Sequence, residues 1–368
     1  MARSFRCAAA ALVYLALAQP SLAVQWVKQD VYVSPYEYSI GTSLALGAGL
    51  RPHIAYTSGV DGSVNYATQT AAGWQTQTVA PSGGSYISTS LAIDALDHPA
   101  IIYGLSTSGV NYAHSDGSTW STESLSTGNG GLTDLAFDSA GNAHVAYTDN
   151  FDVRYAKRIG GSFNTTTVGT SYFPHRPLEL ALNPQGYPRF AYWEQSPSAQ
   201  LKYAAWNGTS WNVSTVTTLT SQADGKVSLA LDSSGTPHLL FHQDVFLKYA
   251  TLSGSGWNIQ TVPALGHTGT GMEYAIAIRP DDKPAIVFNE GVTKATFAIL
   301  ESGVWQTELL AQNSKSVGYF SLTLDLLSRP HVSYWQGDRV IYAVGVPEPA
   351  MLTILVCALW TAMHRTRR

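Results

Sequence analysis

Cysteine is almost absent from this chain of 368 residues. The only two, Cys7 and Cys357, lie in apolar segments near the two ends. The part between those segments therefore has no thiol, which excludes a disulfide, a cysteine nucleophile and a cysteine-bound metal there. Its stability must come from a hydrophobic core, and about 320 residues are enough to build one.

Charge is also scarce, since Asp, Glu, Lys and Arg make up 12% of the chain, about half the usual share. Five of the 21 basic residues and one of the 25 acidic residues lie in the end segments 1–23 and 346–368, which leaves 16 and 24 and a net charge of −8. This balance argues against nucleic acid or an anionic membrane surface as a partner.

The first residues have the features of a secretory signal peptide. Two arginines precede an apolar run over residues 7–18, and Ser21 and Ala23 form a small-x-small site. The run is too short for a membrane span. We therefore expect a signal peptide over residues 1–23 that signal peptidase removes after Ala23.

The last 23 residues, 346–368, contain Pro347, Glu348 and Pro349, then an apolar stretch over residues 350–363 and a basic end. A helix of this stretch would span about 21 Å, less than a ~30 Å hydrocarbon core, and the basic end would keep the upstream chain outside the cytoplasm. In this order the three parts resemble the PEP-CTERM sorting signal of bacterial proteins processed by an exosortase. The resemblance implies that an exosortase-like enzyme removes the apolar sorting helix at the cell surface or its matrix, so that only the tail contacts the membrane, and only transiently. A plain tail anchor is the alternative.

Seven copies of a repeat fill residues 24–345. Each copy combines a small, apolar segment of the Ser-Leu-Ala-Leu type, a second apolar segment, a segment resembling Val-Asn-Tyr-Ala and a more polar segment marked by an aromatic residue. These markers are Trp26, Trp74, Trp120, Phe163, Trp211, Trp257 and Trp305, at intervals of 43–48 residues. Four short strands in such a period predict an all-β fold, a seven-bladed β-propeller.

The seventh copy stops at Ala343 without a fourth strand, and the segment Gln25–Val31 carries a spare marker, Trp26. We therefore predict that this N-terminal strand completes the last blade, because closure leaves no edge strand unpaired.

Two sets of polar residues recur with the repeat. The first consists of residues that open the first hairpin turn, which we interpret as turn caps rather than calcium ligands: Asp94, Asp138, Asn183, Asp232 and Asp325. The second consists of histidines in four copies, which we interpret as structural rather than metal-binding because equivalent positions lie far apart in a ring: His53, His144, His238 and His331. The sequence predicts no metal and no cofactor, and no nucleotide-binding motif is present.

Residues that differ between copies point to a binding face. They follow the second strands or lie in the loops between blades, and the candidate ligand-binding residues are Trp193, Glu194, His242, Gln243, Glu290, Trp335, Gln336, Tyr172 and Tyr274. Exposed aromatic rings among amides and carboxylates suit stacking on sugars. The alternative is that these rings only plug the mouth of the ring.

Three functions fit these patterns. The first is an exported, non-catalytic module that binds a polysaccharide or another matrix component. The second is a purely structural matrix protein. The third is a polysaccharide hydrolase or lyase, for which the catalytic candidates are Glu194 and Glu290, with His242 or Asp149, as acid and base.

Overall fold

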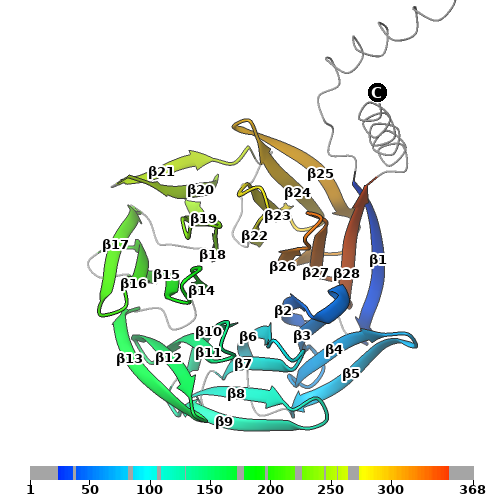
Figure 1. Ribbon diagram of the computed structural model, residues 1–368. Helices are drawn as coiled ribbons and strands as arrows, with labels where there is room; N and C mark the ends of the chain where they lie inside the picture. The colour runs from blue at the N-terminus through cyan, green and yellow to red at the C-terminus, as the bar shows by residue number, and fades with distance from the viewer. Residues whose placement is uncertain are drawn as a thin grey trace, which may run out of the picture.

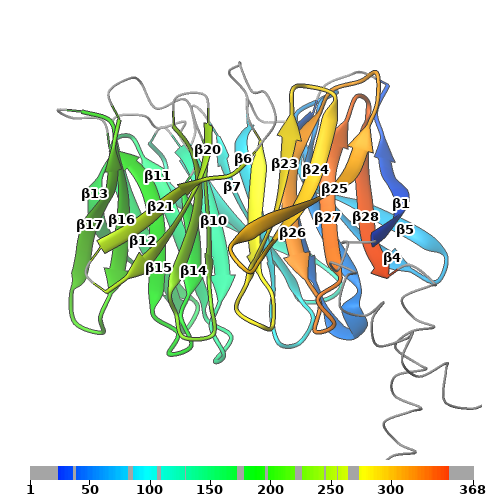
Figure 2. The ribbon, with the colours of Figure 1, turned by 90° about the horizontal axis from the view of Figure 1, so that it is seen from above.

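A computed structural model describes residues 24–35, 39–81, 86–105, 109–128, 130–171, 178–194, 198–219, 226–243, 246–254, 256–263 and 273–347. It confirms the predicted β-propeller: seven four-stranded antiparallel sheets stand around a central channel (Figure 1). Figure 2 shows the blades from the side of the ring, with the strands running between its two faces. The predicted signal peptide and most of the predicted tail, including Glu348 and Pro349, lie outside the described residues.

The first three blades follow the chain from the innermost to the outermost strand. Blade 1 comprises β2 (Ser39–Leu46), β3 (Pro52–Ser58), β4 (Val64–Thr70) and β5 (Gly73–Ala80), with a 3-10 turn, η1 (Ala48–Leu50), after β2. Blade 2 comprises β6 (Tyr86–Ile93), β7 (Pro99–Leu105), β8 (Gly109–Ser115) and β9 (Trp120–Ser126). Blade 3 comprises β10 (Gly130–Phe137), β11 (Ala143–Asp149), β12 (Asp152–Ile159) and β13 (Ser162–Thr170).

The next three blades repeat this order. Blade 4 comprises β14 (Glu179–Leu182), β15 (Pro188–Glu194), β16 (Gln200–Trp206) and β17 (Trp211–Thr218). Blade 5 comprises β18 (Val227–Leu231), β19 (Pro237–Gln243), β20 (Phe246–Ser253) and β21 (Gly256–Thr261). Blade 6 comprises β22 (Tyr274–Ile278), β23 (Pro284–Glu290), β24 (Lys294–Glu301) and β25 (Val304–Gln312).

Blade 7 closes the ring with both ends of the described chain. It comprises β26 (Val317–Leu324), β27 (Pro330–Gln336), β28 (Arg339–Pro347) and, as its outermost strand, β1 (Val24–Val33). β1 pairs antiparallel with β28, so that Val24 lies opposite Pro347, and Figure 1 shows the two strands side by side. The prediction that an N-terminal strand completes the last blade is therefore confirmed.

The aromatic markers pack between blades. In each of the seven junctions, the marker on an outermost strand lies edge-on against an aromatic ring of the preceding blade's third strand, with ring centroids 5.2–5.5 Å apart. The pairs are Tyr66–Trp120, Tyr112–Phe163, Tyr155–Trp211, Tyr203–Trp257, Tyr249–Trp305, Phe297–Trp26 and Tyr342–Trp74. Such pairs contribute about 0.5–1.5 kcal/mol each beyond the area they bury, which explains why an aromatic residue recurs in both places.

The four repeated histidines are buried, and each hydrogen-bonds to a tyrosine and lies beside an aspartate. Each Nδ1 lies 2.5–2.7 Å from a tyrosine hydroxyl of the same blade, and each Nε2 lies 3.1–3.6 Å from an aspartate carboxylate. The sets are Tyr66–His53–Asp97, Tyr155–His144–Asp138, Tyr249–His238–Asp232 and Tyr342–His331–Asp325. Three of the aspartates also cap the first hairpin turn through backbone N–H groups, as predicted.

Within the described ranges, no group of three or more His, Cys, Asp and Glu side chains is placed to hold a metal ion. The same part of the chain contains no helix of the length and apolar character needed to cross a membrane.

Candidate functional site

Three aromatic residues expected on the binding face are buried. Trp193 is 1% exposed, Trp335 is 5% exposed and Tyr274 is 2% exposed, and each belongs to a core cluster. The second strands are flanked by other strands in the sheet and by neighbouring blades on both faces, so that their aromatic side chains point into apolar contacts. The expectation that these three rings are exposed is therefore wrong. Tyr172 lies outside the described residues.

The three acidic candidates are engaged in ion pairs within their own blades. Glu194 lies 3.2 Å from Lys202 Nζ, and Glu290 lies 2.9 Å from Lys294 Nζ. The Asp149 carboxylate is 3.4 Å from Arg154 Nε. In every case the partner lies on the adjacent third strand. An ion pair within the blade therefore explains the presence of each acidic residue, and no substrate contact is needed to explain it.

The remaining candidates also lie at the ends of second strands. His242, at the end of β19, is 7% exposed, while Gln243 and Gln336 are half-buried beside it and at the equivalent place in blade 7. The structure thus places Glu194, His242, Glu290 and Trp335 on four different blades, and it does not bring them together into one constellation.

Exposed apolar side chains do occur on this face, two or three residues beyond the predicted positions. Phe151 is 53% exposed, Phe246 is 51% exposed and Val292 is 67% exposed, all at connections between a second and a third strand. The Phe246 ring also lies 5.1 Å from Lys248 Nζ. These three apolar side chains stand apart from one another on the face, and they were not predicted because the candidates were taken from the ends of the second strands and the loops between blades.

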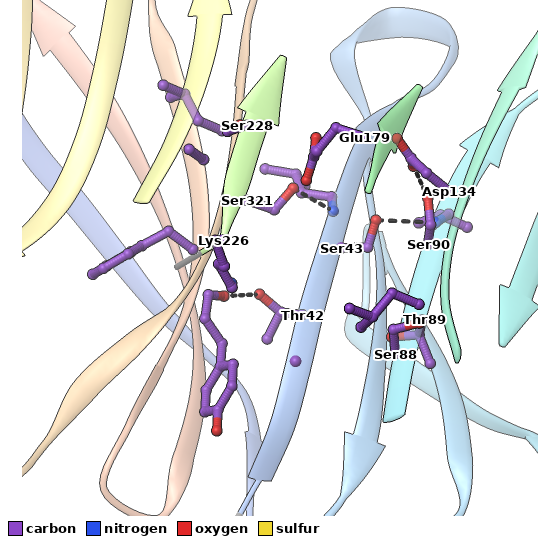
Figure 3. Close-up of a pocket in the computed structure, with 18 of the residues that line it drawn as sticks. Thr42, Ser43, Ser88, Thr89, Ser90, Asp134, Glu179, Lys226, Ser228 and Ser321 are labelled. Carbon is purple, nitrogen blue, oxygen red and sulfur yellow. Dashed lines mark hydrogen bonds between the residues drawn. The ribbon is translucent and has the colours of Figure 1, made fainter. Parts of the chain in front are cut away.

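The central channel holds a cavity of about 300 Å³. Residues in the middle of the longer inner strands and near the start of the shorter ones line it, so that all seven blades contribute to its wall. Figure 3 shows that its wall is rich in hydroxyl and charged side chains. No other cavity described for this chain is lined by every blade.

One position of the inner strand forms a belt of hydrogen bonds around the cavity. Its members precede the first leucine or isoleucine of each copy and are Ser43, Ser90, Asp134, Glu179, Ser228, Ala275 and Ser321. The side chain accepts a hydrogen bond from a backbone N–H of the next blade at five junctions. The donors are Leu44 (to Ser321), Leu91 (to Ser43), Leu180 (to Asp134), Leu229 (to Glu179) and Ile276 (to Ser228). The belt therefore gives the serines a structural role.

Asp134 and Glu179 place two carboxyl groups in this belt, on neighbouring blades. Asp134 accepts hydrogen bonds from Ser90 Oγ at 2.6 Å and from Leu180 N at 2.6 Å, so that both of its oxygens are used. Burial raises the pKa of Asp134, against the effect of these hydrogen bonds. Burial and then the charge of Asp134 raise the pKa of Glu179 well above its usual range, although Lys226 acts in the opposite direction.

An ion pair lies beside the carboxyl pair. Lys226 pairs with Glu273 of the next blade, and its Nζ lies 5.6 Å from the centre of the Tyr319 ring. Burial is the largest single effect and lowers the pKa of Lys226, but the charge and hydrogen bond of Glu273, together with Glu179 and Tyr319, raise the pKa overall. The ammonium group therefore stays charged and lies on the channel wall near Glu179.

Tyr319 lines the cavity in a sparsely populated backbone conformation. Its φ is +54°, where non-glycine residues are uncommon, and the β26–β27 register shifts between Gly318 and Ser321 around it. The Tyr319 carbonyl accepts a hydrogen bond from Thr42 Oγ1 at 2.8 Å, which fixes this bulge against blade 1. Backbone strain of this kind costs about 1–3 kcal/mol and concentrates at functional sites.

The sequence itself carries a signal for this site, although the residues were not predicted as candidates. Asp134 and Glu179 replace the serine of the Ser-Leu-Ala-Leu pattern in two consecutive copies, whereas the other copies keep serine or alanine there. Lys226 lies two residues before the same position. These charged residues of the innermost strands face the channel. They could be identified as channel residues only once the register of the strands in the ring was known.

Comparisons with known proteins support the fold and no closer relationship. No protein-family model matches the chain, and no curated protein matches it. Among solved structures, a catalytically inactive virginiamycin B lyase from Staphylococcus aureus with quinupristin is 10% identical over 88% of this chain and 100% of that chain, with a TM-score of 0.60. A protein of unknown function from Dyadobacter fermentans is 10% identical over 89% and 100%, with a TM-score of 0.57. The Aleuria aurantia lectin in complex with Fucα1-6GlcNAc is 13% identical over 75% and 98%, with a TM-score of 0.54.

Proposed function

We propose that the protein is an exported, non-catalytic module that binds a glycan in the central channel. The observation that carries this proposal is the 300 Å³ cavity, in which Glu179, Lys226 and Tyr319 meet on one wall. A carboxyl group with a raised pKa donates as well as accepts hydrogen bonds, as sugar hydroxyl groups do. The Tyr319 ring supplies an apolar surface beside these polar groups.

Two further features support the proposal. Thr89 Oγ1 lines the cavity and has no hydrogen-bond partner within the described part of the chain, so that a ligand hydroxyl would satisfy it. The propeller of the Aleuria aurantia lectin accommodates Fucα1-6GlcNAc, which makes a sugar ligand compatible with this architecture. Export follows from the signal peptide expected at residues 1–23, and surface sorting from the resemblance of residues 346–368 to the PEP-CTERM signal.

A glycan panel with calorimetry tests the channel site. We expect a bound glycan to lose at least about tenfold in affinity in Glu179→Gln and in Lys226→Met, because each change removes a charge-assisted or donor contact worth about 1.5–3 kcal/mol. Glu194→Gln is the matched control, since Glu194 is an acid of the same blade that pairs with Lys202 outside the channel. Unchanged affinity in both channel variants, with melting temperatures equal to that of the parent, would sink the proposal.

Hydrolysis or lysis of a polysaccharide is the second candidate, and Glu179 is the observation that favours it. A carboxyl group of raised pKa is what the general acid of a glycosidase needs, and Asp134 places a second carboxyl group on the neighbouring blade. Product formation from a bound glycan that stops in Glu179→Gln would establish this activity. The same assay on Glu194→Gln and Glu290→Gln tests the pair that the sequence suggested. Absence of any ligand would favour a structural matrix role.

A further inference from the structure

A second cavity lies between blades 6 and 7, away from the central channel. Its volume is about 400 Å³, and its wall contains the ends of β25 and β27 and the adjoining parts of β28 and β1. Three cationic and two anionic side chains line it: Lys28, Lys315, Arg339, Asp30 and Asp338. Amide groups of Gln312, Asn313 and Gln336 complete the polar wall.

Tyr334 lines this cavity with a hydroxyl group that the fold leaves unsatisfied. The residue is 0% exposed, and its Oη has no hydrogen-bond partner within the described residues. A buried polar atom of this kind costs about 1–3 kcal/mol, and the large majority of such atoms are paired. An unpaired Oη in the wall of a cavity therefore indicates a group that is completed from outside the chain.

Comparison with another blade explains why Tyr334 lacks a partner. In blade 3 the equivalent Tyr147 hydroxyl bonds to Thr165, which lies on the outermost strand opposite Ala156. In blade 7 the residue in the threonine's place is Lys28, which lies opposite Ala343. Lysine has no hydroxyl group that could bond to the tyrosine, and the cavity lies where that hydrogen bond is missing. Blade 2 follows the blade 3 pattern with Tyr103 and Thr122.

The charges of the cavity do not balance. Arg339 pairs with Asp30 and lies 3.5 Å from Asp338, and Lys315 Nζ lies 3.1 Å from Asp338. Lys28 has no ion pair among the described side chains and is the surplus cation. An unpaired ammonium group next to an unsatisfied hydroxyl and several amides suits a ligand that carries one carboxylate and several hydroxyls.

We propose that this cavity is a binding site for a carboxylated sugar such as a uronic acid residue. Lys28 binds the carboxylate, and the Tyr334 hydroxyl and the Gln312 and Gln336 amides bind the ring hydroxyls. The net charge of the whole domain does not prevent this, because exposed charges more than about 8 Å away are largely screened at physiological salt. The site is separate from the channel site and does not depend on it.

Binding of galacturonate, compared with neutral galactose, tests the site in calorimetry at low and physiological salt. We expect measurable galacturonate binding to the parent, a loss of at least about tenfold in Lys28→Met and a loss of about three- to tenfold in Tyr334→Phe. Galactose should bind more weakly than galacturonate to the parent and equally to parent and Lys28→Met. The channel variants Glu179→Gln and Lys226→Met should leave galacturonate affinity unchanged, which separates this site from the proposed channel function.

Stability measurements provide an independent check. Tyr334→Phe should be at least as stable to urea as the parent, because it removes a buried hydroxyl that makes no bond in the fold, whereas Tyr147→Phe should be less stable because it loses the bond to Thr165. Equal destabilisation by the two changes would overturn the premise of an unsatisfied hydroxyl. Absence of galacturonate binding to the folded parent, or equal binding to parent and Lys28→Met, would overturn the site.

Discussion

Four buried histidines hold the same place in four blades, and each is held by a tyrosine and an aspartate. Burial is the main cause that lowers the pKa of all four, to about 4 for His53. In the unfolded chain these histidines titrate near pH 6.5. Between their folded pKa values and 6.5 the unfolded chain therefore binds more protons, so that stability falls as the pH falls through this window.

We expect the free energy of unfolding to be independent of these histidines above about pH 7 and to fall below pH 6.5, by up to about 1.4 kcal/mol per pH unit for each histidine. Urea unfolding between pH 7.5 and 5 measures this slope. His238→Gln should reduce the slope by the share of one group. A stability that stays level from pH 7.5 to 5 would contradict the assignment of buried, neutral histidines.

The His53 network departs from the others in the source of its carboxylate. Blade 1 has Gly47 where the other three histidine-bearing blades have aspartate, and Asp97 from the hairpin of blade 2 takes its place beside His53. A Cβ on Gly47 would lie 2.0 Å from Asp97 Oδ1 and 2.5 Å from His53 Nε2. The φ of Gly47 is −93°, so that space, not backbone conformation, requires glycine here.

Gly47→Ala should therefore destabilise the protein by about 1–3 kcal/mol, the usual cost of overpacking. The double variant Gly47→Asp, Asp97→Gly should regain part of that loss, because it moves the carboxylate to its own hairpin as in the other three histidine-bearing blades. Urea unfolding of the single and double variants decides this. A double variant less stable than Gly47→Ala would show that Asp97 has another structural role, such as its bond to Ala48 N at 2.7 Å.

At the scale of strands, β1 does more than add a fourth strand to blade 7. Gln29 Oε1 accepts hydrogen bonds from Trp74 Nε1 at 2.9 Å and from Gln69 Nε2 at 2.7 Å, both in blade 1. Trp26 lies edge-on against Phe297 of blade 6. The strand supplied by the N-terminal end of the described chain thus contacts three consecutive blades.

Gln29→Ala should lower the free energy of unfolding by about 1–3 kcal/mol, because it leaves two donors of the ring junction without a partner. Gln25→Ala, at an exposed position of the same strand, is the control and should change stability by less than about 0.5 kcal/mol. Equal effects of the two changes would mean that the Gln29 bonds do not hold the junction.

The strands were predictable from the sequence because the signals that define them are local and recur. The marker Trp26, for example, is enough to identify the closing strand, since it repeats the pattern of the other outermost strands. Exposure was not predictable in the same way. Tyr192 and Trp193 are consecutive, yet both are buried, since β15 is covered on both faces by neighbouring blades. Without alternation along the strand, no sequence pattern separates a ring that faces a ligand from one that faces the core.

The residues of the candidate site could not be predicted, because their proximity depends on how the blades are arranged in the ring. Asp134 and Glu179 are 45 residues apart, and they become neighbours only because successive inner strands lie side by side around the channel. The lining of the second cavity is still more distant in sequence, because Lys28 and Tyr334 come from opposite ends of the chain. The repeat predicted the ring, but it did not show which of the residues that differ between copies lie close together in space.

For the molecule as a whole, stability should depend on the seam, which is the place in the ring where the first and last strands of the chain meet. A permutant that joins Pro347 to Val24 by a short glycine linker and opens at residues 81–85 would have no strand shared across the new seam. One that instead opens between β4 and β5 would keep an exchanged outermost strand. We expect the second permutant to match the parent in urea unfolding and the first to be less stable, because only a shared strand provides backbone hydrogen bonds across the seam. Equal stability of the two would contradict this role of β1.

The antiparallel pairing of Val24 with Pro347 also determines how the ring responds to mechanical load. A force that pulls these two adjacent ends apart acts along the hydrogen bonds, which lie perpendicular to the strands, and breaks them one pair at a time. A force between Pro347 and the glycan proposed for the channel would instead have a component along β28, so that many bonds would share that component in shear. In the proposed state, tethered at its C-terminal end and bound to a glycan, the ring should withstand tension between β28 and the glycan better than tension between its two ends.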